Sequence, residues 1–252
     1  MLNKTDTIAA LGKGLRVLEC FSADRARLAI ADVADTTGLD RATARRCLLT
    51  LHDLGYADYD GKFFSLTPRV LRLGMGALAA LPLPQIVQPW LDHLSEQIGQ
   101  SCSVSILDET EIVYVARAAQ RRVMSIGLMP GSRLPAHCTS MGRVLLAALP
   151  EDEARAIVEA SDLMPRTPRS LTDPEDIMNV LTEVRMKGYA LIDQEVELGL
   201  RSLALPVFNT HGMVVAALNT GLAAVQPDPN EIVSLYLPPM QKVQGGLRRV
   251  LQ

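Results

Sequence analysis

Residues 30–56 read IADVADTTGLDRATARRCLLTLHDLGY, which predicts two short helices joined by a turn at Gly38. At about 3.6 residues per turn, the second helix has two distinct faces. Its apolar face consists of Ala44, Cys47, Leu48 and Leu51. Its other face carries Ala42, Arg45 and Arg46. A turn between two helices, the second bearing arginines, is the layout of a helix-turn-helix DNA reader and indicates gene control rather than catalysis.

The flanking segments predict a small winged domain around this pair. Asp40 is placed to cap the second helix, and Leu39 to pack on Ala44 as a hydrophobic staple. Upstream, an amphipathic helix over residues 11–21 would pack under the pair through Leu11, Leu15, Leu18 and Phe21. Downstream, residues 57–66 read ADYDGKFFSL, in which Asp60-Gly61 predicts a two-residue hairpin turn and therefore a wing.

The expected contacts to duplex DNA come from the second helix and the wing tip: Arg41, Thr43, Arg45, Arg46 and Lys62. An arginine fork can engage guanine O6 and N7, and a threonine can meet a phosphate or a thymine methyl. A lysine at a wing tip can approach a phosphate. The alternative is a solvated helix face, since arginines are common there, but the wing and the turn favour DNA.

A strongly apolar helix should follow the wing. Thr67-Pro68 is a good helix start. The apolar positions of this helix are Val70, Leu71, Met75, Leu78 and Leu81. Such a helix needs a partner surface, and a second copy of the chain supplies one, so homodimerisation is expected. The LPLP stretch at residues 81–84 predicts a hinge, because both prolines interrupt a helix.

The remainder alternates helices and strands. CSVSIL and EIVYVARA, joined by DET, predict an antiparallel pair. Helices are expected near residues 85–98, 140–149, 151–160, 174–187 and from 228, and strands near 189–193, 202–208 and 213–220. The pattern predicts an α+β fold with a central antiparallel sheet.

Composition narrows the class of protein. The 252 residues include 48% hydrophobic residues, enough for a sizeable core. No leader segment or run of about 18 to 20 apolar residues occurs, so a cytoplasmic protein without membrane contact is expected. The four cysteines are spread without a CxxC, which argues against disulfides and metal. Aromatic residues reach only 4%, which favours duplex over single-stranded DNA.

Several long motifs in this order resemble the IclR family of bacterial transcriptional regulators. They include GSRLPAHCTSMGRVLLA at 131–147 and DQEVELGLRSLALPVF at 193–208. Within the family, LDRATARRCLLTL and IVYVARA resemble the subgroup governing protocatechuate and β-ketoadipate catabolism. The resemblance implies a winged DNA-binding domain at 1–67, a linker helix and hinge at 68–84, and a GAF-like effector domain at 85–252. It further implies a dimer or tetramer on palindromic operator DNA, with a small organic or aromatic acid as effector and no cofactor.

An acid effector needs apolar walls and a few fixed donors. By similarity to the family's effector sites, the lining residues are expected to include Leu134, Thr139, Ser140, Met141, Ser202 and Asn219 or Thr220. Arg133 and Arg201 are the first expected partners of the carboxylate, with Arg117 behind them, because an arginine fork matches a carboxylate. Asp193 is expected beside them. The alternative is that either arginine pairs with Asp193, Glu195 or Glu197 and only braces the loop.

Two rival functions remain. The chain could bind DNA constitutively, with a C-terminal domain that serves only assembly. It could instead be an enzyme acting on a small acid, with Cys138 as nucleophile. Neighbouring residues of an extended segment point to opposite faces, so His137 cannot serve Cys138 as a base. No catalytic motif such as HExxH, GxSxG or a P-loop is present, so no catalytic residue is expected.

Overall fold

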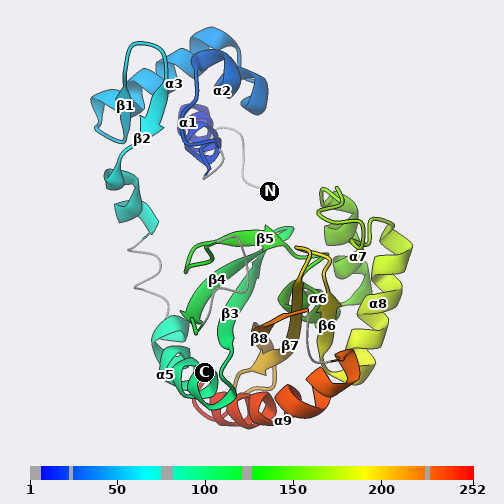
Figure 1. The fold of residues 1–252 in the computed structure, drawn as a ribbon. Helices are drawn as coiled ribbons and strands as arrows, with labels where there is room; N and C mark the ends of the chain where they lie inside the picture. Colours follow the sequence, from blue (N-terminus) through cyan, green and yellow to red (C-terminus); the bar gives the residue numbers. More distant parts are fainter. Residues whose placement is uncertain (1–6, 23–24, 75–81, 121–126, 225–227) are drawn as a thin grey trace. The chain divides into compact units, whose positions relative to one another are not determined.

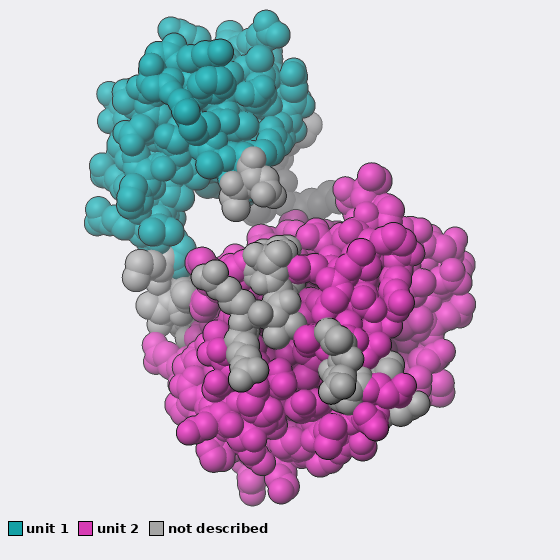
Figure 2. All heavy atoms as spheres, in the orientation of Figure 1, with its two compact units in different colours: residues 1–80 teal, residues 81–252 magenta. Residues whose placement is uncertain are grey.

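A computed structural model describes residues 7–22, 25–74, 82–120, 127–224 and 228–252. The chain divides into two compact units, residues 1–80 and residues 81–252, which are coloured teal and magenta in Figure 2. Within the described ranges, no helix has the length and apolar character needed to cross a membrane.

The first unit contains the predicted helix-turn-helix (Figure 1). Its helices are α1 (Ala9–Glu19), α2 (Ile30–Thr37) and α3 (Arg41–Asp53). Helix α2 ends at Gly38, whose φ of +67° lies in the left-handed region that glycine adopts without strain. Asp40 caps α3 by accepting a hydrogen bond from the Thr43 backbone N–H at 2.8 Å. Both local signals for the turn and for the start of the second helix are confirmed.

Helix α1 packs differently from its predicted face. Leu11 and Leu15 are 62% and 47% exposed, whereas Val17 and Cys20 are buried. Among the described residues, α1 contributes to the buried core beneath α2 and α3 only through its C-terminal end, so Leu11 and Leu15 stay outside that core. The predicted packing through Leu11 and Leu15 is therefore wrong, while Leu18 and Phe21 do pack against this core.

The wing is formed by β1 (Ala57–Tyr59) and β2 (Phe64–Leu66), with Tyr59 opposite Phe64. Four residues connect the strands, so the predicted two-residue turn is wrong. The reason is Asp60, whose carboxylate accepts hydrogen bonds from the backbone N–H groups of Phe63 and Lys62 and folds the longer loop around itself. These bonds, with a contribution from the Arg27 ion pair, hold the pKa of Asp60 at about 2.

The chain after the wing begins a helix as predicted. Thr67 accepts a hydrogen bond from the Arg69 N–H at 3.3 Å and starts a 3-10 turn, η2 (Pro68–Val70), with helical backbone over 71–74. The linker positions Met75, Leu78 and Leu81 lie outside the described residues. Pro82 and Pro84 do not interrupt a helix; they lie in the first turn of α5 (Pro82–Ile98), where a missing N–H costs no hydrogen bond.

The second unit is built on a six-stranded sheet in which every neighbouring pair is antiparallel. The spatial order is β5-β4-β3-β8-β7-β6. The strands are β3 (Ser101–Asp108), β4 (Glu111–Ala118), β5 (Arg133–Pro135), β6 (Ala190–Asp193), β7 (Leu200–Phe208) and β8 (Val214–Ala223). The predicted α+β class with a central antiparallel sheet is confirmed; β5 is an addition.

Helices cover both faces of this sheet (Figure 1). Helices α5 and α9 (Pro229–Leu247) pack together on one face, over a core that includes Leu91, Leu203 and Leu218. Helix α6 (Ser140–Ala147) packs on the other face, and α7 (Glu151–Ala160) and α8 (Pro174–Lys187) complete a second core there. The sheet face under α6 carries the small polar side chains from which a site can be built.

Candidate functional site

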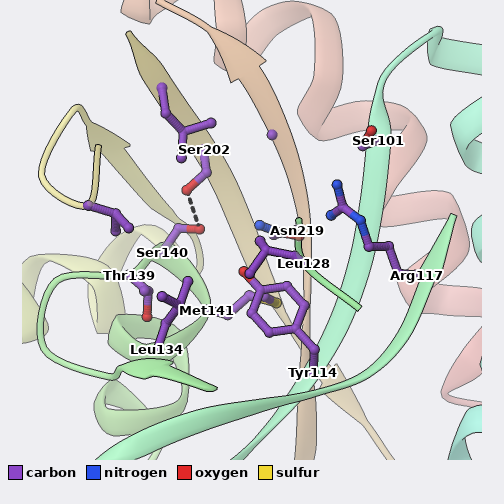
Figure 3. A pocket seen from close by; sticks show the side chains of 13 residues that line it. Ser101, Tyr114, Arg117, Leu128, Leu134, Thr139, Ser140, Met141, Ser202 and Asn219 are labelled. Atoms are coloured by element: carbon purple, nitrogen blue, oxygen red, sulfur yellow. Dashed lines mark hydrogen bonds between the residues drawn. The ribbon is translucent and has the colours of Figure 1, made fainter. Parts of the chain in front are cut away.

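A pocket lies between the N-terminal end of α6 and the sheet (Figure 3). Its lining combines apolar walls with a few polar groups, as is typical of a small-molecule site. The lining residues are Ser101, Tyr114, Arg117, Leu128, Leu134, Thr139, Ser140, Met141, Val196, Leu200, Ser202, Asn219 and Gly221.

Three contacts fix the position of the start of α6 beside this pocket. The Thr139 hydroxyl accepts a hydrogen bond from the Gly142 N–H at 3.1 Å and caps the helix. A Cβ atom on Gly142 would lie 2.1 Å from the carbonyl oxygen of Ala136, so only glycine allows this approach. The Ser202 hydroxyl of β7 donates to the Ser140 hydroxyl at 2.7 Å and joins helix to sheet. The first turn of a helix offers unpaired N–H groups, which favour an anion.

A β-bulge in β4 brings Tyr114 and Arg117 to the same face of the sheet. In a regular strand, residues three apart point to opposite faces. Here Val104 pairs with Ala116 while Ser105 pairs with Tyr114, so β4 holds one extra residue. Val115 and Ala116 consequently both pack into the core under α5 and α9. Tyr114 and Arg117 both turn toward the pocket (Figure 3).

The pocket offers three kinds of polar group. Arg117 is the one cationic side chain among its described lining residues, and its Nη1 donates to the Ser103 hydroxyl at 2.9 Å. Burial raises the pKa of Tyr114 to about 12, so this phenol stays a hydrogen-bond donor at neutral pH. The Oδ1 atom of Asn219 is buried without a hydrogen-bond partner in the described structure. An unpaired buried acceptor indicates a missing donor.

Besides Arg117, six of the expected effector residues line this pocket: Leu134, Thr139, Ser140, Met141, Ser202 and Asn219. Thr220 does not, because alternation along β8 places it on the same face as Leu218 and Leu222, which pack under α5 and α9. The residues that sequence reasoning missed are Ser101, Tyr114, Leu128, Val196, Leu200 and Gly221. Most of them lie on elements whose pocket-facing positions depend on long-range strand pairing.

The two arginines expected first do not line the pocket. Arg133 donates to Glu111 at 2.6 Å and to Asp108 at 2.7 Å on the surface. Arg201 donates through Nε to Asp193 at 2.6 Å. Arg201 thus pairs with one of the acids named in the alternative, whereas Arg133 pairs with two other acids. Arg117, expected behind them, is the cation that the structure brings to the pocket.

Asp193 is also occupied outside the pocket. Besides Arg201, it accepts a hydrogen bond from Arg169 at 2.5 Å. Burial acts to raise its pKa, but the hydrogen bonds from Arg201 and Gln194 and the arginine charges hold the pKa of Asp193 below its ordinary value. Asp193 thus joins β6 to β7 through Arg201 and to the loop between α7 and α8 through Arg169.

His137 and Cys138 lack the arrangement of a catalytic pair. Both are buried, and neither ring nitrogen of His137 has a hydrogen-bond partner in the described structure. Burial raises the pKa of the Cys138 thiol to about 11, so the thiol is protonated at neutral pH. Its weak hydrogen bond goes to the Pro135 carbonyl at 3.9 Å.

The expected DNA contacts are mostly available on the first unit. Arg41, Arg45, Arg46 and Lys62 are exposed, and within the described ranges none of them forms an ion pair. Thr43 differs, because its hydroxyl donates to the Asp40 carboxylate at 2.7 Å as part of the cap. The hydroxyl and the backbone N–H of Thr43 therefore both bond to Asp40 and help to cap α3.

Comparisons with known proteins agree with this architecture. Residues 10–61 match the IclR helix-turn-helix domain, and residues 75–238 match the bacterial transcriptional regulator IclR C-terminal domain. The Pca regulon regulatory protein of Pseudomonas putida is 41% identical over 92% of this chain and 80% of its own length. The p-hydroxybenzoate hydroxylase transcriptional activator of Acinetobacter baylyi is 39% identical over 98% of this chain and 93% of its own length.

One solved structure adds a ligand. A double mutant of the PobR inducer-binding domain from Acinetobacter, in complex with 3-hydroxybenzoic acid, is 35% identical with a TM-score of 0.63. The alignment covers 67% of this chain and 98% of that domain. Family, fold and motif order coincide, and the chain belongs to the IclR family of bacterial transcriptional regulators.

Proposed function

We propose that this chain is a ligand-responsive transcriptional regulator of aromatic-acid catabolic genes, and that a hydroxylated aromatic carboxylate binds in the α6 pocket. The observation that carries the proposal is Arg117, a cation beside apolar walls in a pocket that also holds an unpaired acceptor. The relatives that control Pca genes and p-hydroxybenzoate hydroxylase, and the 3-hydroxybenzoic acid complex, support the same ligand class.

The groups of the pocket match the parts of such a ligand. A carboxylate would pair with the Arg117 guanidinium, since charge-assisted hydrogen bonds to arginine are strong. An aromatic ring would lie against Leu134 and Met141, and a ring hydroxyl would donate to Oδ1 of Asn219. Helix α6 would add its unpaired N–H groups at Ser140. No enzymatic step is part of this proposal.

Regulation requires coupling between the ligand and DNA. The acid would bind one conformation of the second unit more tightly, and the segment after the wing would convert that preference into a change of spacing between two winged domains. Spacing matters because paired domains must meet half-sites about one helical turn, or a multiple, apart. Self-association on palindromic operator DNA is thus part of the proposal.

An operator-binding titration tests domain, pocket and coupling together. Fluorescence anisotropy with labelled operator DNA would be repeated with 4-hydroxybenzoate, protocatechuate and β-ketoadipate. We expect at least one hydroxylated aromatic acid to shift the operator affinity. If no acid changes the operator affinity and calorimetry records no heat of binding, the result would support the alternative in which the chain binds DNA constitutively.

Two substitutions in the winged domain should have different effects. Arg46→Ala should cost about 1 to 3 kcal/mol on the specific operator and relax sequence preference, because it removes an expected base contact. Lys62→Ala should weaken binding to all duplexes similarly and reduce the slope of log K against log salt, because it removes a phosphate contact. Anisotropy titrations on operator and scrambled duplexes at several salt concentrations measure both effects. Wild-type behaviour of both variants would contradict these contacts.

A further inference from the structure

A buried ion pair joins α6 to the loop between β6 and β7. Arg143 and Glu195 are 3% and 8% exposed. Their contact is bidentate, with Nη1 donating to Oε1 at 2.8 Å and Nη2 donating to Oε2 at 2.6 Å. Removing two charges from water can cost more than their attraction returns, so stability alone is a weak explanation for such a pair.

Each partner is also held from a second side. Arg143 Nε donates to the His137 carbonyl at 2.9 Å, which fixes the chain just before α6. Leu171 N–H donates to Glu195 Oε2 at 3.2 Å, and the Ser170 hydroxyl donates to the Glu195 carbonyl at 2.7 Å. The pair therefore holds three segments of chain in one arrangement.

The loop that carries Glu195 adopts a conformation that needs such support. Gln194 has a φ of +62°, in the left-handed region that few side chains adopt. Its side-chain Oε1 accepts a hydrogen bond from the Gly199 N–H at 3.0 Å, and its carbonyl accepts one from the Thr167 hydroxyl at 2.7 Å. An unfavourable backbone conformation persists only where its surroundings determine it.

The segments held by the pair form two walls of the α6 pocket. Ser140 and Met141 begin the helix that carries Arg143, whereas Val196 directly follows Glu195 in the loop. Neither member of the pair lines the pocket itself. The pair can influence a ligand only through the placement of these walls.

We propose that Arg143 and Glu195 are positioning residues that set the affinity of the α6 pocket by holding the Val196 loop against the start of α6. This inference rests on the proposed function, because it assumes that an aromatic acid binds there. A binding site whose supporting contacts loosen by a fraction of an ångström remains present but binds weakly.

The test separates placement from stability. Glu195→Gln alone leaves a buried guanidinium without its counter-charge and should lower the unfolding temperature. The double variant Arg143→Met with Glu195→Leu removes both charges and should recover most of that loss. We expect its affinity for 4-hydroxybenzoate or protocatechuate, measured by calorimetry, to stay about tenfold or more below wild type.

A conservative variant and a matched control complete the design. Glu195→Asp keeps the charge but shortens the side chain, so it should weaken acid binding and lower the unfolding temperature less than Glu195→Gln does. Arg155→Met with Glu175→Leu removes a surface ion pair between α7 and α8 and should leave acid affinity unchanged.

Three outcomes decide the matter. Weakened acid binding by both folded Glu195→Asp and the folded double variant supports the inference. Wild-type affinity in folded Glu195→Asp, or in the double variant at recovered stability, overturns it while the proposed function stands. Absence of binding to any aromatic acid by the wild-type chain overturns both.

Discussion

Replacing Arg117 by methionine is expected to weaken binding of a hydroxylated aromatic acid by about 10- to 100-fold, since hydrogen bonds to a charged group contribute roughly 1.5–3 kcal/mol. Arg117 is the cation that the described pocket presents to a carboxylate. Methionine keeps much of the side-chain volume, so a loss of acid affinity would come from the missing charge rather than from a new cavity. Isothermal titration with 4-hydroxybenzoate and protocatechuate measures it.

The matched control is Arg133→Met. Arg133 pairs with Asp108 and Glu111 on the surface and does not line the pocket, so acid affinity should remain that of the wild type. Because surface ion pairs contribute little to stability, the free energy of unfolding should change by less than about 1 kcal/mol. The reverse result, with Arg133→Met defective and Arg117→Met normal, would place the carboxylate elsewhere.

Gly142→Ala is expected to destabilise the second unit by roughly 3 kcal/mol or more, at the upper end of single substitutions. The added Cβ would lie 2.1 Å from the Ala136 carbonyl oxygen and 2.4 Å from its Cα atom, and backbone cannot yield as a flexible side chain can. Helix α6 would have to move away from β5, which also displaces Ser140. Urea unfolding followed by circular dichroism measures the free energy.

Gly245→Ala provides the comparison within another helix. Within the part of the chain that the structure describes, nothing lies within 4 Å of the Cβ position at Gly245 in α9, so alanine should stabilise by about 0.5–1 kcal/mol through helix propensity. An equal effect of the two substitutions would mean that the close approach at Ala136 does not govern stability.

Local signals predicted much of the fold correctly. The cap at Asp40, the turn at Gly38 and the short connection that pairs β3 with β4 act over a few residues, so the sequence alone determines them. The wing turn was wrong because Asp60 offers side-chain hydrogen bonds that favour a longer loop. The exposure of Leu11 was missed because amphipathicity identifies a face but not how far the core extends.

The site was less predictable, for a physical reason. Resemblance to a family identified residues near the start of α6, where six expected positions do line the pocket. It ranked Arg133 and Arg201 above Arg117 as partners of the ligand carboxylate. The sequence cannot make this choice, because it depends on which protein carboxylates lie near each arginine after folding. Tyr114 was missed altogether, because strict alternation cannot show that Tyr114 and Arg117 share a face.

The bulge in β4 makes the chemistry of the pocket depend on the length of a strand. If β4 kept all of its residues but paired with β3 without the bulge, strict alternation would turn either Tyr114 or Arg117 into the apolar layer beneath α5 and α9. A phenol or a guanidinium there would meet no hydrogen-bonding partner among Val104, Leu203 and Leu218. Ligand recognition and folding would thus fail together on a one-residue change of register, although neither the charge nor the pocket residues had changed.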